Sequence, residues 1–335
     1  MPGEAELIER IAALVGRASG DLIVGIGDDA AVIRKSARQW WLLSIDSQIE
    51  NVHFRRAYTP AHLLGHKALA VNLSDIAAMG GVPRFALLSL MLPRNLPSSF
   101  IDDMLDGMMA LADAHQVVLI GGDVAASGDG LTLTLTIVGE CPAGKILRRD
   151  GARPGDLIFV TGQLGLAAMG LQLLERGYRY APHLPPLQRR LILAHLQPVP
   201  RLEIGRALAE DQLASAAIDL SDGLSTDLFH ICRASDVGAV INSERLPILH
   251  PVPDECEGDE LERALHGGED YELLFTVPKE RLAAIESLRA RFNAFPITLI
   301  GEITDQPHHM YLEHQGRLLP LSPRGHDHLR DGEER

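Results

Sequence analysis

The chain has 335 residues, of which 46% are hydrophobic and 23% charged, and its formal net charge is −14. This length predicts two domains, each with its own core, in a protein of ordinary globular composition. The negative charge argues against a nucleic-acid partner, and no apolar run approaches the roughly 18 residues that a membrane span needs. Three scattered cysteines without CxxC spacing and the lack of a signal-peptide pattern predict a reducing compartment, so we expect a cytoplasmic protein.

The first predicted elements carry acidic residues at their ends. Residues 1–17 have the spacing of an amphipathic surface or docking helix. The sequence LIVGIGDDAAVI predicts strand, turn and strand, with Asp28 and Asp29 at the tip of the turn, and spacing alone does not choose between them. The strand WWLLSID ends with Ser44 and Asp46, which project to one face two residues apart and form a usable pair of oxygen ligands.

A helix from residue 59 to about residue 80 organises the chain. We expect Thr59 to cap it, Pro60 to occupy the first helical position and Gly80 to provide a left-handed exit. Apolar residues recur every three or four positions, and Asp75 falls on the same stripe. A carboxylate on a buried face must be paired, hydrogen-bonded or bound to a metal, because burying it alone is costly.

Strands and a helix complete the first half. We expect a strand at residues 85–92, a helix at 98–115 and a strand at 117–120. That strand runs into Gly121-Gly122-Asp123, which resembles the tight turns where backbone meets phosphate. The sequence LTLTLTIV at residues 131–138 alternates strictly, which predicts a strand with one wet or partner-facing surface and suggests dimerisation through it.

The second half follows a boundary rich in glycine, proline and basic residues near 145–156. We expect strands at residues 157–161, 215–218 and 297–302, and helices within 187–210, 224–234 and 279–292. Asp219, Ser221 and Asp222 then gather where a strand ends and a helix begins, a place that favours anions. Glu269 lies in a glycine turn before a further strand.

These acids together favour a site with several magnesium ions that handles phosphates. Each acid alone is a weak signal, but the chain has few basic residues near them in sequence, and Mg²⁺ prefers oxygen ligands. The sequence has no P-loop, no protein-kinase signature and no nucleophile elbow, so the carboxylates carry the signal.

The same segments resemble a known family. GIGDDAAVI, SIDSQIENVHF, HKALAVNLSDIAAMGGVP, LIGGD, RRDGARPGDLIFVTG, AIDLSDGLSTDL and GGEDYELLFT occur in the order found in thiamine-monophosphate kinases. The resemblance covers residues 20–328 and implies membership of the aminoimidazole ribonucleotide synthetase-like superfamily.

The resemblance implies a two-domain fold, α+β followed by α/β. Residues 1–147 would form an N-terminal domain that binds ATP and Mg²⁺, and its sheet would form a shared barrel in a homodimer. Residues 148–335 would form a C-terminal α/β domain that completes the active site. The implied reaction is ATP-dependent phosphorylation of thiamine monophosphate to thiamine diphosphate, the last step of thiamine diphosphate biosynthesis.

The resemblance also implies site residues. The implied magnesium ligands are Asp29, Ser44, Asp46, Asp75, Asp123, Asp219 and Asp222, and Asp29 is thereby favoured over Asp28. The implied ATP contacts are Gly122, Asp123, Arg149 and Ser221. The implied thiamine-phosphate contacts are His53, Glu269 and His326. Two positions depart from the family pattern: Ile45 stands where Thr is usual, and His326 replaces an aromatic residue.

The mechanism follows from charge. A phosphate acceptor is already anionic at neutral pH, so we expect direct in-line transfer with no catalytic general base, assisted by Mg²⁺ that offsets the repulsion between two polyanions. The alternatives are another ATP-using enzyme of the same superfamily and a nucleotide-binding relative with impaired catalysis. Selenophosphate synthetase would have a reactive Cys near the N-terminus, whereas the first Cys here is Cys141.

Overall fold

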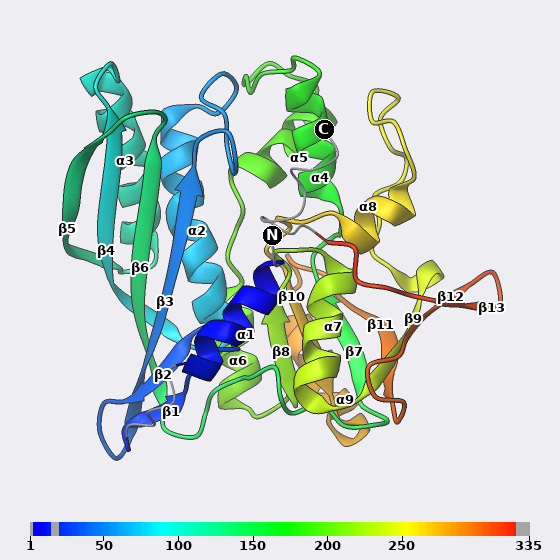
Figure 1. The fold of residues 1–335 in the computed structure, drawn as a ribbon. Helices are drawn as coiled ribbons and strands as arrows, with labels where there is room; N and C mark the ends of the chain where they lie inside the picture. Colours follow the sequence, from blue (N-terminus) through cyan, green and yellow to red (C-terminus); the bar gives the residue numbers. More distant parts are fainter. Residues whose placement is uncertain (1–2, 15–19, 326–335) are drawn as a thin grey trace.

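The fold consists of two mixed β-sheets with helices between and around them (Figure 1). The structure is a computed structural model, and it describes residues 3–14 and 20–325. In Figure 1 the first sheet lies on one side of the molecule and the second on the other, with helix α2 (Ala61–Ala78) between them. This arrangement matches the expected two-part α+β architecture.

The first half builds a six-stranded sheet of order β1-β2-β3-β6-β4-β5. Its strands are β1 (Leu22–Val24), β2 (Ala31–Arg34), β3 (Gln39–Ile49), β4 (Val82–Pro93), β5 (Val118–Ser127) and β6 (Thr132–Pro142). Helices α2 and α3 (Ser98–Ala114) pack together beside this sheet, while α1 (Glu4–Leu14) crosses toward the second half. One face of the sheet thereby contacts helices, and its other face has no cover within the described chain.

The second half builds a seven-stranded sheet of order β13-β12-β9-β11-β7-β10-β8. Its strands are β7 (Leu157–Thr161), β8 (Ala216–Asp219), β9 (Gly238–Asn242), β10 (Leu273–Val277), β11 (Ile297–Thr304), β12 (Met310–His314) and β13 (Arg317–Pro320). The helices of this half are α4 (Leu166–Glu175), α5 (Pro186–Leu196), α6 (Leu202–Glu210), α7 (Leu224–Ser235), α8 (Glu260–His266) and α9 (Leu282–Arg291). The sequence analysis did not identify β9, α8, β12 or β13.

One expectation about the first sheet is wrong. Gly121-Gly122-Asp123 is not a turn, because β5 continues through it and pairs with β4 as far as Ser127. Strand β6 alternates between buried and half-buried residues as its pattern predicts, and β3 and β4 flank it along most of its length. Any contact of β6 with another chain would therefore use its face.

Helix α2 is buried on nearly all sides, and this explains its central position. Its exit is as expected, since Gly80 has φ +69° and the Gly81 N–H bonds to the Ile76 carbonyl at 2.8 Å. Its start differs, because Pro60 is the N-cap and Thr59 makes no capping bond. A helix that is apolar on all sides packs on two partners, as α2 does against β6 on one flank and α6 on the other.

The largest core of the molecule spans both halves, and a further core lies within the second half alone. The largest hydrophobic cluster includes Leu73 and Ile76 of α2, Leu135 of β6, and Phe159 and Phe275 of the second sheet. Phe159 and Phe275 stack on each other with ring centroids 5.7 Å apart. Burial of α2 between both sheets therefore joins the halves into one packed unit.

Close approach of α2 and α3 requires glycine. A Cβ built on Gly107 would lie 1.9 Å from the His62 carbonyl oxygen, and one on Gly65 would lie 1.8 Å from the Met104 carbonyl oxygen. Neither gap admits a methyl group, so the two helices can pack at this distance because both positions lack a side chain. Among the described residues, no helix is long and apolar enough to cross a membrane.

Candidate active site

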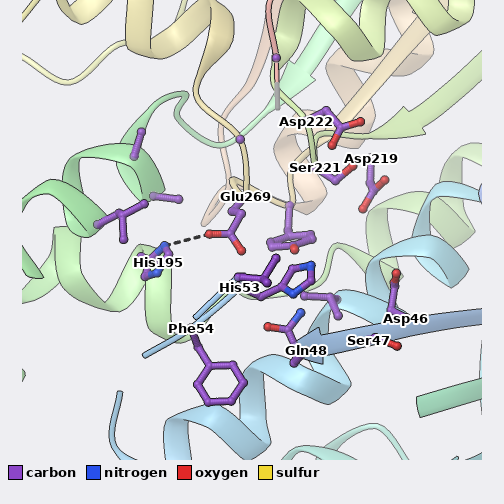
Figure 2. Close-up of a pocket in the computed structure, with 18 of the residues that line it drawn as sticks. Asp46, Ser47, Gln48, His53, Phe54, His195, Asp219, Ser221, Asp222 and Glu269 are labelled. Atoms are coloured by element: carbon purple, nitrogen blue, oxygen red, sulfur yellow. Dashed lines mark ion pairs between the residues drawn. The ribbon is translucent and has the colours of Figure 1, made fainter. Parts of the chain in front are cut away.

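A cavity of about 580 Å³ lies between the two halves. The first half contributes the end of β3, the loop after it and one face of α2, through residues such as Asp46, His53 and Asp75. The second half contributes the loops that follow β8 and α8, through Asp219, Asp222 and Glu269. Figure 2 shows Asp46 and His53 of the first half near Asp219 and Glu269 of the second half, around a common space.

Three carboxylates meet at one end of the cavity, and we call them the acidic cluster: Asp29, Asp75 and Asp219. One carboxylate oxygen of each lies within 4.8 Å of the others. Asp29 follows β1, Asp75 belongs to α2, and Asp219 ends β8, so the cluster draws on both halves. Ser74 Oγ donates to Asp219 Oδ2 at 2.6 Å, and Ser44 Oγ donates to Asp75 Oδ2.

The acidic cluster is electrostatically unfavourable for three ionised carboxylates. Burial, followed by repulsion from neighbours that include Asp46 and Asp219, raises the pKa of Asp75 well above 3.8. Burial and repulsion from Asp29 raise the pKa of Asp219 to about 8. The Asp29 Oδ2 atom is buried without a hydrogen-bond partner. Such a set of hard oxygen atoms favours a cation in its midst.

Arg149 partly compensates this charge. Its guanidinium donates to Asp29 Oδ1, and its backbone N–H donates to Asp28 Oδ2 at 3.3 Å. The pKa of Asp28 rises to about 7, because burial and the adjacent Asp29 outweigh the effect of Arg149. Arg149 follows the first sheet in sequence and thus brings a cation to the cluster from the segment between the halves.

A second group of possible ligands lies beside the first. Side-chain atoms of Asp222, Asp227 and His230 lie within 4.8 Å of one another. Asp227 is 1% exposed and accepts from the backbone N–H groups of Asp222 and Gly223 at 3.2 and 3.0 Å. Asp227 thus fixes the loop that presents Asp222 to the cavity at the start of α7.

The opposite end of the cavity centres on Glu269. Its Oε1 lies 2.8 Å from Lys67 Nζ, and its Oε2 lies 3.1 Å from His195 Nδ1 (Figure 2 draws the latter contact). The Glu269 backbone has φ +67°, and its N–H donates to the Ser221 carbonyl at 2.7 Å. The Tyr271 N–H donates to the Leu220 carbonyl at 2.8 Å, so the two loops are held side by side.

Most residues expected from the sequence converge on this cavity. Those that line it are Asp46, His53, Asp75, Asp219, Ser221, Asp222 and Glu269. Asp29 joins through the acidic cluster, Ser44 through its bond to Asp75, and Arg149 through its ion pair with Asp29.

Two expected residues lie elsewhere in the chain. Gly122 and Asp123 are exposed on the edge strand β5, three strands away from β3. Asp123 lies in a cross-strand row with Ser89 and Thr134, on the uncovered face of the sheet. Ile45 also lies on this face and is 63% exposed. His326 lies outside the described residues.

Sequence reasoning missed several residues of the site. Lys67, His195 and Tyr271 line the cavity or contact a residue that does, and Asp227 fixes the loop of Asp222. Lys67 had a usable signal, because it lies eight residues before Asp75 and therefore on the same helical face. His195 had none, because tertiary packing alone brings α5 to Glu269.

Both halves of the chain match models of one protein family. The N-terminal domain model of the AIR synthase related proteins matches residues 27–141, and the C-terminal domain model matches residues 153–311. Hydrogenase maturation protein HypE in complex with ATP has a TM-score of 0.68 over 88% of each chain at 20% identity, which shows a shared fold.

Two curated proteins that are more similar to this chain share the same name. Thiamine-monophosphate kinase of Salmonella typhimurium is 39% identical, covering 98% of each chain, and that of Bacillus subtilis is 37% identical, covering 92% of this chain and 94% of its own. A structure described as AaThiL complexed with AMPPCP and TMP has a TM-score of 0.83 at 33% identity over 97% of each chain. With these relatives matched over nearly the whole chain, and with the acids of both halves meeting in one cavity, the chain belongs to the thiamine-monophosphate kinase family.

Proposed function

We propose that this protein phosphorylates thiamine monophosphate with ATP to give thiamine diphosphate, the last step of thiamine diphosphate biosynthesis, in the cytoplasm. The observation that carries the proposal is the meeting of Asp29, Asp75 and Asp219, from both halves, at one end of a cavity. Family membership supports the choice of substrates, since AaThiL has been described in complex with AMPPCP and TMP.

We propose that the cavity holds several Mg²⁺ ions. The donors fit, because they are hard oxygen atoms, burial and mutual repulsion raise the pKa values of Asp75 and Asp219, and Asp29 Oδ2 lacks a hydrogen-bond partner. The proposed ligands are Asp29, Ser44, Asp46, Asp75, Asp123, Asp219 and Asp222. Bound Mg²⁺ would neutralise charge on the phosphate groups.

The protein's own contribution is to bind and align two anions. We assign Arg149, Ser221, Gly122 and Asp123 to ATP. Arg149 suits a phosphate because its guanidinium can pair bidentately with oxygen atoms, and it already lies among the acids. No side chain needs to remove a proton from the acceptor phosphate, so we propose in-line transfer without a general base.

The thiamine-phosphate contacts are assigned to His53, Glu269 and His326. His53 and Glu269 line the cavity from opposite halves. Along the face of α2, eight residues separate Lys67 beneath Glu269 from Asp75 in the acidic cluster, a helical rise of about 12 Å. That separation suits a substrate with a ring system at one end and a phosphate at the other.

We further propose that residues 1–147 and 148–335 form two domains, the first binding ATP and Mg²⁺ and the second completing the site. A homodimer would place the uncovered face of the first sheet inside a shared barrel. This face and the β5 edge expose Ile45, Ile120 and Val124, which are 63%, 56% and 67% exposed. A strand edge that exposes apolar side chains favours a protein partner, and we propose that this partner is a second copy of the chain.

The dimer would bring Asp123 to the site of the partner copy. Within its own chain Asp123 is on the uncovered face, so it serves the acidic cluster only across an interface. Co-expression of Asp123→Ala and Asp222→Asn chains tests this. Each variant alone should be inactive, and mixed dimers should contain one intact site, giving up to about a quarter of wild-type activity. Activity of Asp123→Ala alone, or no recovery in the mixture, would overturn the assignment.

The test of the proposed function is formation of thiamine diphosphate from purified protein, ATP, Mg²⁺ and thiamine monophosphate. Product and ADP should appear in equal amounts, and EDTA should stop the reaction. The second candidate is a relative with impaired catalysis, which the departures at Ile45 and His326 favour. Thermal stabilisation by ATP with Mg²⁺, without any product, would support that candidate.

A further inference from the structure

A buried lysine and a buried histidine contact the carboxylate of Glu269 on its protein side. Lys67 is 0% exposed, and its Nζ lies 2.8 Å from Glu269 Oε1. The His195 side chain is 3% exposed, and its Nδ1 lies 3.1 Å from Glu269 Oε2. Glu269 itself is 25% exposed at its side chain and lines the cavity. One carboxylate therefore has both oxygen atoms engaged on the protein side and still faces the cavity.

The charge of this trio is balanced before any ligand enters. Among the ion pairs of the described residues, Glu269 is the acid that pairs with the buried Lys67 Nζ atom, which has no hydrogen bond of regular geometry. Burial and the nearby Lys67 lower the pKa of His195, so the imidazole is neutral at pH 7. A neutral ring whose Nδ1 lies 3.1 Å from a carboxylate oxygen is expected to carry its proton on that nitrogen, so His195 presents an N–H to Glu269, although the contact lacks regular hydrogen-bond geometry.

The backbone conformation of Glu269 is unfavourable and needs contacts that hold it in place. Its φ of +67° is in the left-handed region, which costs a non-glycine residue free energy unless the surroundings hold it. The bond from its N–H to the Ser221 carbonyl fixes one side of the residue, and the two buried groups fix the carboxylate. A carboxylate oxygen has two lone pairs, so each oxygen retains one acceptor direction for a ligand.

From this geometry we propose that Lys67 and His195 are positioning residues: they hold Glu269 in its strained conformation, with free acceptor directions aimed into the cavity, to receive N–H donors of the substrate's ring system. This inference rests on the proposed function. The chemical class it selects is a nitrogen heterocycle with an exposed amino group, at the end of the cavity away from the acidic cluster.

The first test is Lys67→Met, with steady-state kinetics for both substrates. We expect the KM for thiamine monophosphate to rise at least tenfold and the KM for ATP to stay within twofold, because Arg149, a proposed ATP contact, pairs with Asp29 in the acidic cluster, at the other end of the cavity. Lys67→Arg, which keeps the charge, should recover part of the loss. Equal losses for both substrates would indicate a merely structural role and overturn the proposal.

The second test asks whether Lys67 acts through Glu269. In a Glu269→Gln background, adding Lys67→Met should change the KM for thiamine monophosphate less than twofold, since the group being positioned is already altered. Multiplicative effects would mean that Lys67 acts independently, and the proposal would be wrong. His195→Gln provides a second variant should Lys67→Met fold poorly, and it should also raise this KM selectively.

Binding without turnover gives an independent readout. Thiamine monophosphate alone should raise the melting temperature of the wild type, and this shift should be lost in Lys67→Met while the shift with ATP and Mg²⁺ remains. Lys279→Met and His66→Gln are matched controls outside the cavity and should behave as wild type. A wild-type protein that forms no thiamine diphosphate refutes the proposed function, whereas an active wild type with an unchanged Lys67→Met refutes the positioning role alone.

Discussion

Replacing Asp75 by Asn should separate the stability of this protein from its activity. Asn has the shape of Asp and keeps an oxygen acceptor for the Ser44 hydroxyl, but it removes one negative charge from the acidic cluster. The oxygen atoms of the cluster lie within 4.8 Å of one another, and at an effective dielectric constant near 20 each ionised pair repels by about 3.5 kcal/mol. At pH 9 in EDTA, above the pKa of about 8 of Asp219, we therefore expect Asp75→Asn to raise the free energy of unfolding by up to about 3.5 kcal/mol, the repulsion of one ionised pair.

The effect on catalysis should be the opposite. Loss of a proposed magnesium ligand should lower kcat by at least ~100-fold, more than the usual cost of losing a residue that hydrogen-bonds to such a ligand. Saturating Mg²⁺ should stabilise the wild type and have little effect on Asp75→Asn. Urea denaturation suits the measurement because the shared core favours cooperative unfolding, and Asp106→Asn, an exposed acid on α3, is the control. A variant less stable than wild type in EDTA, or one with near-normal turnover, would refute the reasoning.

The remaining predictions concern pH and packing. Asp219 binds a proton in the fold up to about pH 8 but in the unfolded chain only up to about 3.8, so the folded state holds more protons between these values. Stability in EDTA should therefore fall as pH rises from 5 to 8, and saturating Mg²⁺ should flatten the profile of urea midpoint against pH; a rise with pH in EDTA would contradict the assignment. Gly107→Ala should destabilise the protein by about 1–3 kcal/mol or more, because its Cβ would lie 1.9 Å from the His62 carbonyl oxygen. Thermal melting against Ala110→Gly, an exposed position on the same helix, checks this, and a variant as stable as wild type would show that α2 and α3 can move apart.

Much of this fold could be predicted from the sequence because its strongest signals are local. Helix α2 has turn residues at both ends, β6 alternates strictly, and β7 begins and ends where the sequence indicates. The elements that were missed include β12 and β13, short strands in the last part of the chain. Gly121 and Gly122 were read as a turn because glycine pairs usually form turns, whereas here they continue an edge strand.

The candidate site was predictable to the extent that its residues end strands or lie on one helical face. Asp75, Asp219 and Glu269 all had such a signal, and all three reach the cavity. The partners that hold them had none, since His195 lies far from Glu269 in sequence and meets it only through the packing of α5. The position of Asp123 could not be predicted either, because its place in the sequence does not reveal which face of the sheet it occupies.

The burial of α2 against both sheets has a consequence for dividing the chain. A fragment that ends near residue 147 would keep α2 but lose α6 and β8, and would leave one flank of the helix, with Ala77 among its residues, in water. The complementary fragment would expose Phe159 and Phe275 in turn. Each piece made separately should therefore aggregate, because the apolar surface of the shared core would face water.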